Sequence, residues 1–255
     1  MAASRYSSLA LSADGSVWSW GWVGWGKLGH GDEEDQWQPK KVEAFAGQRI
    51  VAVSSGYSHS LALTADGAVW SWGEGGYGQL GHGNGHGNEQ AQLLPKKIEA
   101  FADQHVAAVS AACSLAITAD GAIWSWCFGD FGLGQLGHGD NQNQLLPMKA
   151  EAFAWQRVVA VSAGDRHSLA ITADGALWSW GGGAFGCLGH GNEQSQLLPK
   201  KVEALAGRRV VALSAELDAD GAVFTWGAGG LGRLGHGEDL SNQLLPKKVE
   251  APSRE

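Results

Sequence analysis

The chain has few cysteines, and those it has follow no pattern typical of a metal site or a disulfide framework. The three cysteines do not have the spacing of metal ligands, and any disulfide between two of them leaves the third unpaired. They are Cys113, Cys127 and Cys187. This usage is typical of a reducing compartment rather than of a secreted scaffold. We therefore expect an intracellular protein of the cytoplasm or the nucleus, with an organelle as the alternative.

Long apolar runs are also missing. Only two methionines occur, and no stretch is long and apolar enough to predict a membrane-spanning helix. The opening residues, MAASRYSSLALSADG, contain no charged leader followed by an apolar core, so we expect no signal peptide. No segment sustains an apolar period of 3.6 residues, which argues against long amphipathic helices.

Positive charge is scarce. The chain has 18 Lys and Arg against 26 Asp and Glu, and its formal net charge is −8. Most affinity for nucleic acid comes from Lys and Arg that neutralise phosphates, so we expect no nucleic-acid partner. The paired lysines do not form a basic run, because each pair is soon followed by a glutamate, as in Lys40-Lys41 and Glu43.

What the chain has in abundance is repetition. Five near-copies of a segment of roughly 50 residues follow one another, and a fixed period of this size predicts a solenoid or a propeller. An Asp-Gly turn marks each copy, in steps of 52, 54, 54 and 46 residues. We expect a single domain over 1–255, with repeats at roughly 14–65, 66–119, 120–173, 174–219 and 220–251. The turns are Asp14-Gly15, Asp66-Gly67, Asp120-Gly121, Asp174-Gly175 and Asp220-Gly221.

The second copy shows how one repeat is built. Short runs of alternating or β-branched residues are separated by the turn at Asp66-Gly67 and by a glycine-rich loop, and Pro95 opens a last run suited to an edge strand. Four short antiparallel strands per repeat predict a propeller blade. The four runs are Ile50–Ser54, Ser60–Thr64, Ala68–Trp72 and Lys96–Ala100.

Paired tryptophans occupy one strand of each copy. Residues two apart face the same side of a strand, so each pair offers a broad aromatic surface to a neighbouring blade. We interpret these tryptophans as packing residues. The pairs are Trp18 and Trp20, Trp70 and Trp72, Trp124 and Trp126, Trp178 and Trp180, and Phe224 with Trp226.

The repeated pattern DGxVWSWGxxxxGQLGHG, followed by LLPKKVEAF and RVVAVSAGxxHSLAIT, resembles the regulator of chromosome condensation family. The resemblance covers nearly the whole chain and recurs five times. It implies an all-β propeller. Members include the exchange factor for the GTPase Ran, modules of HERC-type ubiquitin ligases and the plant UV-B photoreceptor, so the resemblance does not choose a function. Those propellers have seven blades, closed by a blade that combines strands from both termini.

The strand count departs from that pattern and predicts about five blades. In the fifth copy the second strand shrinks to Ala215–Asp218, so one blade is truncated. We expect residues 1–13, with a strand at Ser8–Ser12, to complete the last blade as an incomplete composite. Two arrangements follow. A closed ring is slightly favoured because it removes exposed edges, whereas an open arc leaves apolar ends for a partner or a second copy.

No residue pattern predicts catalysis, a metal site or a cofactor. The recurring Gly-His-Gly histidines are expected to form hydrogen bonds within their own blades, and His82 with His86 makes only a weak metal pair. The glycine loops precede no helix, so they are not phosphate loops. We expect no enzymatic activity. The recurring histidines are His30, His82, His138, His190 and His236.

The predicted function is a non-catalytic protein-interaction scaffold, with self-association through the incomplete seam as an option. The first alternative is an exchange factor or regulator of a small GTPase, although the insertions near Asn84–Asn88 and Phe128–Leu133 are too small for a nucleotide-displacing wedge. The second alternative is a sugar-binding propeller that uses exposed aromatics. UV sensing is disfavoured, because no tryptophan stands in the segment Gly56–Ser60 that matches the photoreceptor motif.

Partner-binding residues are expected where the repeat breaks. Trp155 stands in a turn where other copies have glycine or aspartate, and Trp22 stands where they have small residues or glutamate. Exposed tryptophans are frequent interface anchors. Trp37 replaces a leucine and is equally consistent with a core position. The insertion adds Asn84, His86 and Asn88 as candidates.

Overall fold

The structure is a computed structural model, and it describes residues 1–4, 6–83, 91–127, 133–164, 166–213, 216–217 and 223–249. In this part of the chain the regular structure consists of antiparallel sheets and three-residue 3-10 turns. No helix in it is long and apolar enough to cross a membrane. The candidates Asn84, His86 and Asn88 lie outside the described residues, as does most of Phe128–Leu133.

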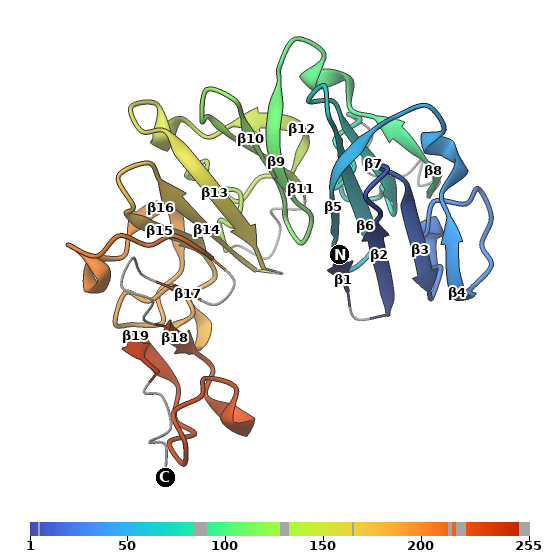
Figure 1. The fold of residues 1–255 in the computed structure, drawn as a ribbon. Helices are drawn as coiled ribbons and strands as arrows, with labels where there is room; N and C mark the ends of the chain where they lie inside the picture. The colour runs from blue at the N-terminus through green and yellow to red at the C-terminus, as the bar shows by residue number, and fades with distance from the viewer. Residues whose placement is uncertain are drawn as a thin grey trace.

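Five sheets follow one another along the chain, and four of them have four strands (Figure 1). The first contains β1 (Ala2–Ala3), β2 (Ser7–Leu11), β3 (Val17–Gly21) and β4 (Gln36–Lys41). The second contains β5 (Ile50–Ser55), β6 (His59–Thr64), β7 (Val69–Gly73) and β8 (Gln92–Lys97). The third contains β9 (Val106–Ser110), β10 (Ser114–Thr118), β11 (Ile123–Cys127) and β12 (Gln144–Lys149). The fourth contains β13 (Val158–Ala163), β14 (His167–Thr172), β15 (Leu177–Gly181) and β16 (Gln196–Lys201).

Three of the four strands predicted in the second copy are confirmed within a residue, but the fourth is misplaced. It runs over Gln92–Lys97 instead of Lys96–Ala100, because the ladder shifts register after Ser71 and pairs Gly73 with Gln92. Pro95 lies inside this strand, and the strand tolerates it because it forms the edge of the sheet. The residues that follow form a 3-10 turn, η3 (Glu99–Phe101).

These 3-10 turns connect each sheet to the next. In η2 (Glu43–Phe45) the Phe45 ring is buried and meets Trp70 and Trp72 of the second sheet edge to face, with ring centroids 5.8 and 5.6 Å apart. Phe101 and Phe153 repeat the contact with the tryptophans of the third and fourth sheets. The apolar core is therefore divided into clusters that lie between neighbouring sheets.

In the second to fifth sheets, the second tryptophan of the pair also joins two sheets by a hydrogen bond. Its indole Nε1 donates to the backbone carbonyl oxygen that precedes Leu-Gly-His-Gly in the previous sheet, and three of these indoles are fully buried. The same carbonyl also accepts a serine hydroxyl in three cases. The packing role predicted for these residues is confirmed. The bonds are Trp72 to Lys27 at 2.8 Å, Trp126 to Gln79 at 3.0 Å, Trp180 to Gln135 at 2.9 Å and Trp226 to Cys187 at 2.8 Å.

The sheets form an open arc, with the first and the last sheet at its two ends (Figure 1). This corrects the slight preference for a closed ring. It also corrects the pairing expected for residues 1–13, because β2 pairs with β3 of the first sheet and Ser8 lies opposite Trp20. The tight turn at Asp14-Gly15 makes this local pairing available at little entropic cost. Ala2–Ala3 supplies the fourth strand of this sheet, at the edge opposite β4, which the sequence did not reveal.

The fifth sheet is truncated, as predicted. Its described strands are β17 (Glu216–Leu217), β18 (Val223–Gly227) and β19 (Gln243–Lys248). The strand expected over Val210–Ser214 does not form in its described residues, 210–213, where only Val210 makes a bridge.

Replacing Trp126 by Phe tests the hydrogen bond between sheets. The ring can still pack on Phe101, but the bond to Gln79 is lost, so we expect the free energy of unfolding to fall by about 1–2 kcal/mol. Urea unfolding followed by tryptophan fluorescence measures the loss. Trp155→Phe at an exposed position is the control and should cost nothing measurable. Equal losses in both variants would contradict the role assigned to the indole nitrogen.

Candidate functional site

The recurring histidines are held within their own sheets. Each Nε2 lies 2.8–3.0 Å from the hydroxyl of a Ser or Thr on the tryptophan strand, and that hydroxyl donates to a nearby leucine carbonyl. The structural interpretation is confirmed. In the described part of the chain, no group of three or more His, Cys, Asp or Glu side chains is placed to hold a metal ion.

One end of the sheets carries the loops that form the candidate site. Because His59 pairs with Gly73, the loop between β5 and β6 and the glycine loop after β7 lie at the same end of the second sheet. The same register holds in the fourth sheet, where His167 pairs with Gly181. We call this end of the arc the loop face.

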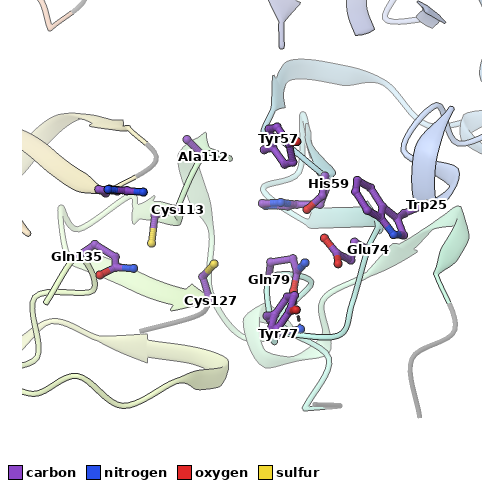
Figure 2. A pocket seen from close by; sticks show the side chains of 12 residues that line it. Trp25, Tyr57, His59, Glu74, Tyr77, Gln79, Ala112, Cys113, Cys127 and Gln135 are labelled. Carbon is purple, nitrogen blue, oxygen red and sulfur yellow. Dashed lines mark hydrogen bonds between the residues drawn. The ribbon is translucent and has the colours of Figure 1, made fainter. Parts of the chain in front are cut away.

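The loop face contains a cavity of about 720 Å³ that four consecutive sheets line. Figure 2 shows aromatic side chains and Glu74 on one side of it, and two cysteines with Gln135 on the other. No single repeat could form this cavity, because its walls come from different blades. The residues that the argument uses are Trp25 of the first sheet, Tyr57, Glu74 and Tyr77 of the second, Cys113 and Cys127 of the third, and Arg166 of the fourth.

A second cavity of about 620 Å³ lies beside the first and shares Trp25, Glu74 and Tyr77 with it. Glu33 and Leu93 are among its other lining residues. Trp25 and Tyr77 thus stand between two hollows, with carboxylates near them.

Trp25 occupies a repeated position where the backbone is left-handed. Its φ is 59°, and the equivalent Phe185 and Leu231 have φ values of 59° and 64°. This conformation costs a non-glycine residue roughly 1–2 kcal/mol. All three side chains are exposed, and Trp25 is 40% exposed. This position is not among the residues predicted from the sequence, although every copy has a large, mostly apolar residue directly before this loop glycine.

A buried lysine lies under the aromatic residues of the first sheet. Lys27 Nζ donates to Ser4 Oγ at 3.2 Å and to the Tyr57 carbonyl oxygen at 3.1 Å, and it lies 5.5 Å from the centre of the Trp22 ring. Burial lowers the pKa of Lys27 to about 8. The lysine therefore ties the first sheet to the loop that carries Tyr57.

A serine and a histidine meet near the cavity, but they do not form a nucleophile. His59 Nε2 lies 2.9 Å from Ser114 Oγ of the next sheet, and burial lowers the pKa of His59 to about 4. The Ser114 hydroxyl donates its proton to the Gln79 carbonyl, not to the imidazole. Since an activated serine needs a base as its acceptor, this pair holds two sheets together.

The tryptophans proposed as anchors lie apart from one another. Trp22 is 40% exposed and packs edge to face on Tyr6 and Trp25, beside the cavity. Trp155 is 97% exposed, as expected, but it follows β12 and so lies at the opposite end of the strands. Trp37 is 90% exposed on the edge strand β4, so the alternative of a core position is wrong. The equivalent residues in the other copies are leucines, which also lie on the edge strands of their sheets.

The repeated blade, the hydrogen bonds between sheets and the loop-face cavity can now be set against known proteins. The model of the RCC1-like domain matches residues 1–255. The chain belongs to the RCC1-like domain family. Human HERC2, an E3 ubiquitin-protein ligase, is 38% identical over 212 residues, which is 81% of this chain and 4% of that protein. The ultraviolet-B receptor UVR8 of Arabidopsis thaliana is 38% identical over 210 residues, 81% of this chain and 46% of the receptor.

Solved structures show the same RCC1-like architecture. Human WBSCR16 superimposes with a TM-score of 0.83 at 27% identity, over 97% of this chain and 66% of that one. Prp20p of Saccharomyces cerevisiae, whose structure was reported with its binding to Gsp1p and histones, gives 0.81 at 23% identity, over 96% of this chain and 61% of that one. This chain therefore spans less than two thirds of these relatives.

The buried histidines predict loss of stability in acid. Burial lowers the pKa of His59 and of His82 to about 4 from an ordinary 6.5, so the fold favours their neutral forms. The stability that these neutral forms provide is complete above the unfolded pKa of about 6.5 and falls as the pH drops toward about 4. Urea unfolding over this pH range measures the decline. The double variant His59→Gln, His82→Gln should show a shallower decline, and an unchanged slope would contradict the assignment.

Proposed function

We propose that this RCC1-like chain is a non-catalytic protein-interaction scaffold that binds a segment of a partner protein on its loop face. The observation that supports this most directly is the cavity of about 720 Å³ whose lining is shared by four sheets. A site assembled from several blades offers a wide and rigid platform, because each wall is fixed by the packing of its own sheet. We place the protein in a reducing compartment, as its cysteine content suggests.

The lining has the composition of a protein-binding site. Trp25, Tyr57 and Tyr77 are each about half exposed, between 40% and 52%, and such side chains supply large contact areas at low cost in conformational entropy. Glu74 and Arg166 give the walls both signs of charge. A partner segment with an apolar anchor and flanking polar residues fits this arrangement.

The position of Trp25 beside Trp22 supports the same proposal. Trp25 lines the cavity, packs edge to face on Trp22 and remains 40% exposed, so part of its surface is available to a partner. Trp22 extends the aromatic surface from the rim of the cavity. We therefore propose Trp22 and Trp25 as one continuous anchor.

Trp37 and Trp155 remain proposed contacts of a different kind. Trp37 lies on the outer edge of the first sheet and Trp155 at the end opposite the loop face. A partner that used either of them together with the cavity would have to wrap around the arc. A further option is that a partner, or a second copy of the chain, binds at the ends of the arc. Trp20 of the first sheet is only partly buried, whereas the equivalent tryptophans of the inner sheets are fully buried, namely Trp72, Trp126 and Trp180.

Two other functions are separable by experiment. Nucleotide exchange on a small GTPase would appear as accelerated release of labelled GDP in an assay on a panel of purified GTPases. Sugar binding through Trp25 and Tyr57 would appear on a glycan array. A positive result that depends on Trp25 in either assay would replace the scaffold proposal.

The test of the proposed site compares aromatic variants at one repeated position. The partner is first captured from the source cell and identified by mass spectrometry, and binding is then measured with the purified partner. We expect Trp25→Ala and Tyr77→Ala each to weaken binding by about tenfold or more, which is ~1.4 kcal/mol and typical of an anchor residue.

Phe185→Ala is the matched control, because Phe185 has the same backbone conformation in the fourth sheet but does not line the cavity. It should leave binding unchanged. The variants Trp37→Ala and Trp155→Ala report on the separate contacts. Binding that survives Trp25→Ala and Tyr77→Ala but is lost in Trp155→Ala would move the site away from the loop face.

A further inference from the structure

The third sheet departs from the repeat at the end of its tryptophan strand. The strands β3, β7, β15 and β18 all end in a glycine, and the φ values of Gly21, Gly73, Gly181 and Gly227 lie between 99° and 109°. The strand β11 ends instead in Cys127, with φ 144°. A residue with a Cβ is strained in this region. Cys127 is therefore present in spite of its backbone conformation.

In the first, second and fourth sheets the glycine is needed because the preceding loop lies close to it. A Cβ on Gly73 would come within 2.5 Å of the Ser58 carbonyl oxygen, and one on Gly181 within 2.6 Å of the Arg166 carbonyl oxygen. In the third copy that loop is shorter. Three residues separate Ser110 from Ser114, whereas five separate the matching serines of the second copy. The shorter loop leaves room for the side chain of Cys127.

The same shortening brings a second thiol to this point. Ser114, the first residue of β10, lies directly opposite Trp126 in the antiparallel ladder. Cys113 immediately precedes Ser114 and Cys127 immediately follows Trp126, so the two cysteines adjoin a ladder pair whose Cα atoms are about 4.5–5.5 Å apart, within the span of about 4.4–6.8 Å that disulfides bridge. Both residues line the same cavity. Figure 2 shows both side chains on the same side of the cavity.

We propose that Cys113 and Cys127 form a dithiol site in the wall of the loop-face cavity, which a low-molecular-weight disulfide oxidises to an intramolecular disulfide. Cys127 is the more accessible of the two, since Cys113 is buried. The thiolate of Cys127 attacks the small disulfide R–S–S–R, forms a mixed disulfide and releases one R–SH. Cys113 then attacks the Cys127 sulfur and releases the second R–SH. Both protein thiols lose their protons, and the small disulfide is reduced to two thiols.

The environment of Cys113 is consistent with a site that stays reduced until an oxidant enters the cavity. The hydrogen bond to Cys127 and burial raise the pKa of Cys113 well above its usual value. Because the thiolate is the reacting species, exchange at this site is slower than at an exposed cysteine. The reaction therefore needs prolonged exposure to the oxidant.

The experiment incubates the purified full chain with oxidised glutathione, blocks remaining thiols with iodoacetamide and digests the protein with trypsin. Residues 98–149 form one tryptic peptide that contains both cysteines, since no Lys or Arg lies between Lys97 and Lys149. We expect this peptide to lose two hydrogens and to take up no alkyl group. Reduction with dithiothreitol before blocking should restore two alkyl groups. Cys187, in a different peptide, should not be linked to either thiol.

The control variants separate the proposed site from general thiol reactivity. Cys187→Ser should form the disulfide as the natural chain does. Cys127→Gly, which restores the residue of the other sheets, should fold and should not yield the peptide lacking two hydrogens. Two alkyl groups on the natural peptide after exhaustive oxidation would overturn the proposal. Two glutathione adducts on that peptide would overturn it as well, because they would show that the thiols cannot reach each other. Neither outcome bears on partner binding at the loop face.

Discussion

Each sheet after the first is joined to the preceding sheet by one tryptophan, which is fully buried in the second, third and fourth sheets and partly buried in the fifth. Its ring packs on the aromatic or aliphatic side chain of the preceding 3-10 turn, and its nitrogen donates to a carbonyl of the preceding glycine loop. Apolar packing alone would allow neighbouring sheets to shift relative to each other. The hydrogen bond forms only when the tryptophan lies at one position relative to the carbonyl of the preceding sheet. The loops of successive blades are therefore held at the same end, and a shared cavity becomes possible.

The repeated residues serve this packing between sheets. Any binding specificity of the chain therefore depends on positions that differ between copies. The aromatic residues of the first sheet and the thiols of the third sheet both lie on the loop face, around one cavity. Cys127 holds a backbone conformation that belongs to glycine in the other sheets. At this strand the chain departs from its own repeat, at an energetic cost, beside the cavity that several blades share.

The open arc is a consequence of local pairing. A tight turn joins β2 to β3, so the N-terminal strand completes the first sheet and is not available to the last one. An inner blade buries one surface against each neighbouring blade. At the two ends of the arc, part of the corresponding surface remains uncovered. The segment of UVR8 that matches this chain is 46% of that receptor.

The sequence by itself determined the blade, because the period, the Asp-Gly turns and the Trp-x-Trp pairs are local patterns that fix strands and the faces they bury. It also predicted that the Gly-His-Gly histidines are structural, and the structure confirms that each lies within hydrogen-bonding distance of a hydroxyl in its own sheet. Only the tertiary structure decided that the arc is open, that Trp22 and Trp155 lie at opposite ends of the strands, and that Cys113 and Cys127 line one cavity. These facts depend on how blades are placed relative to one another and on register, which contacts between residues far apart in the sequence decide.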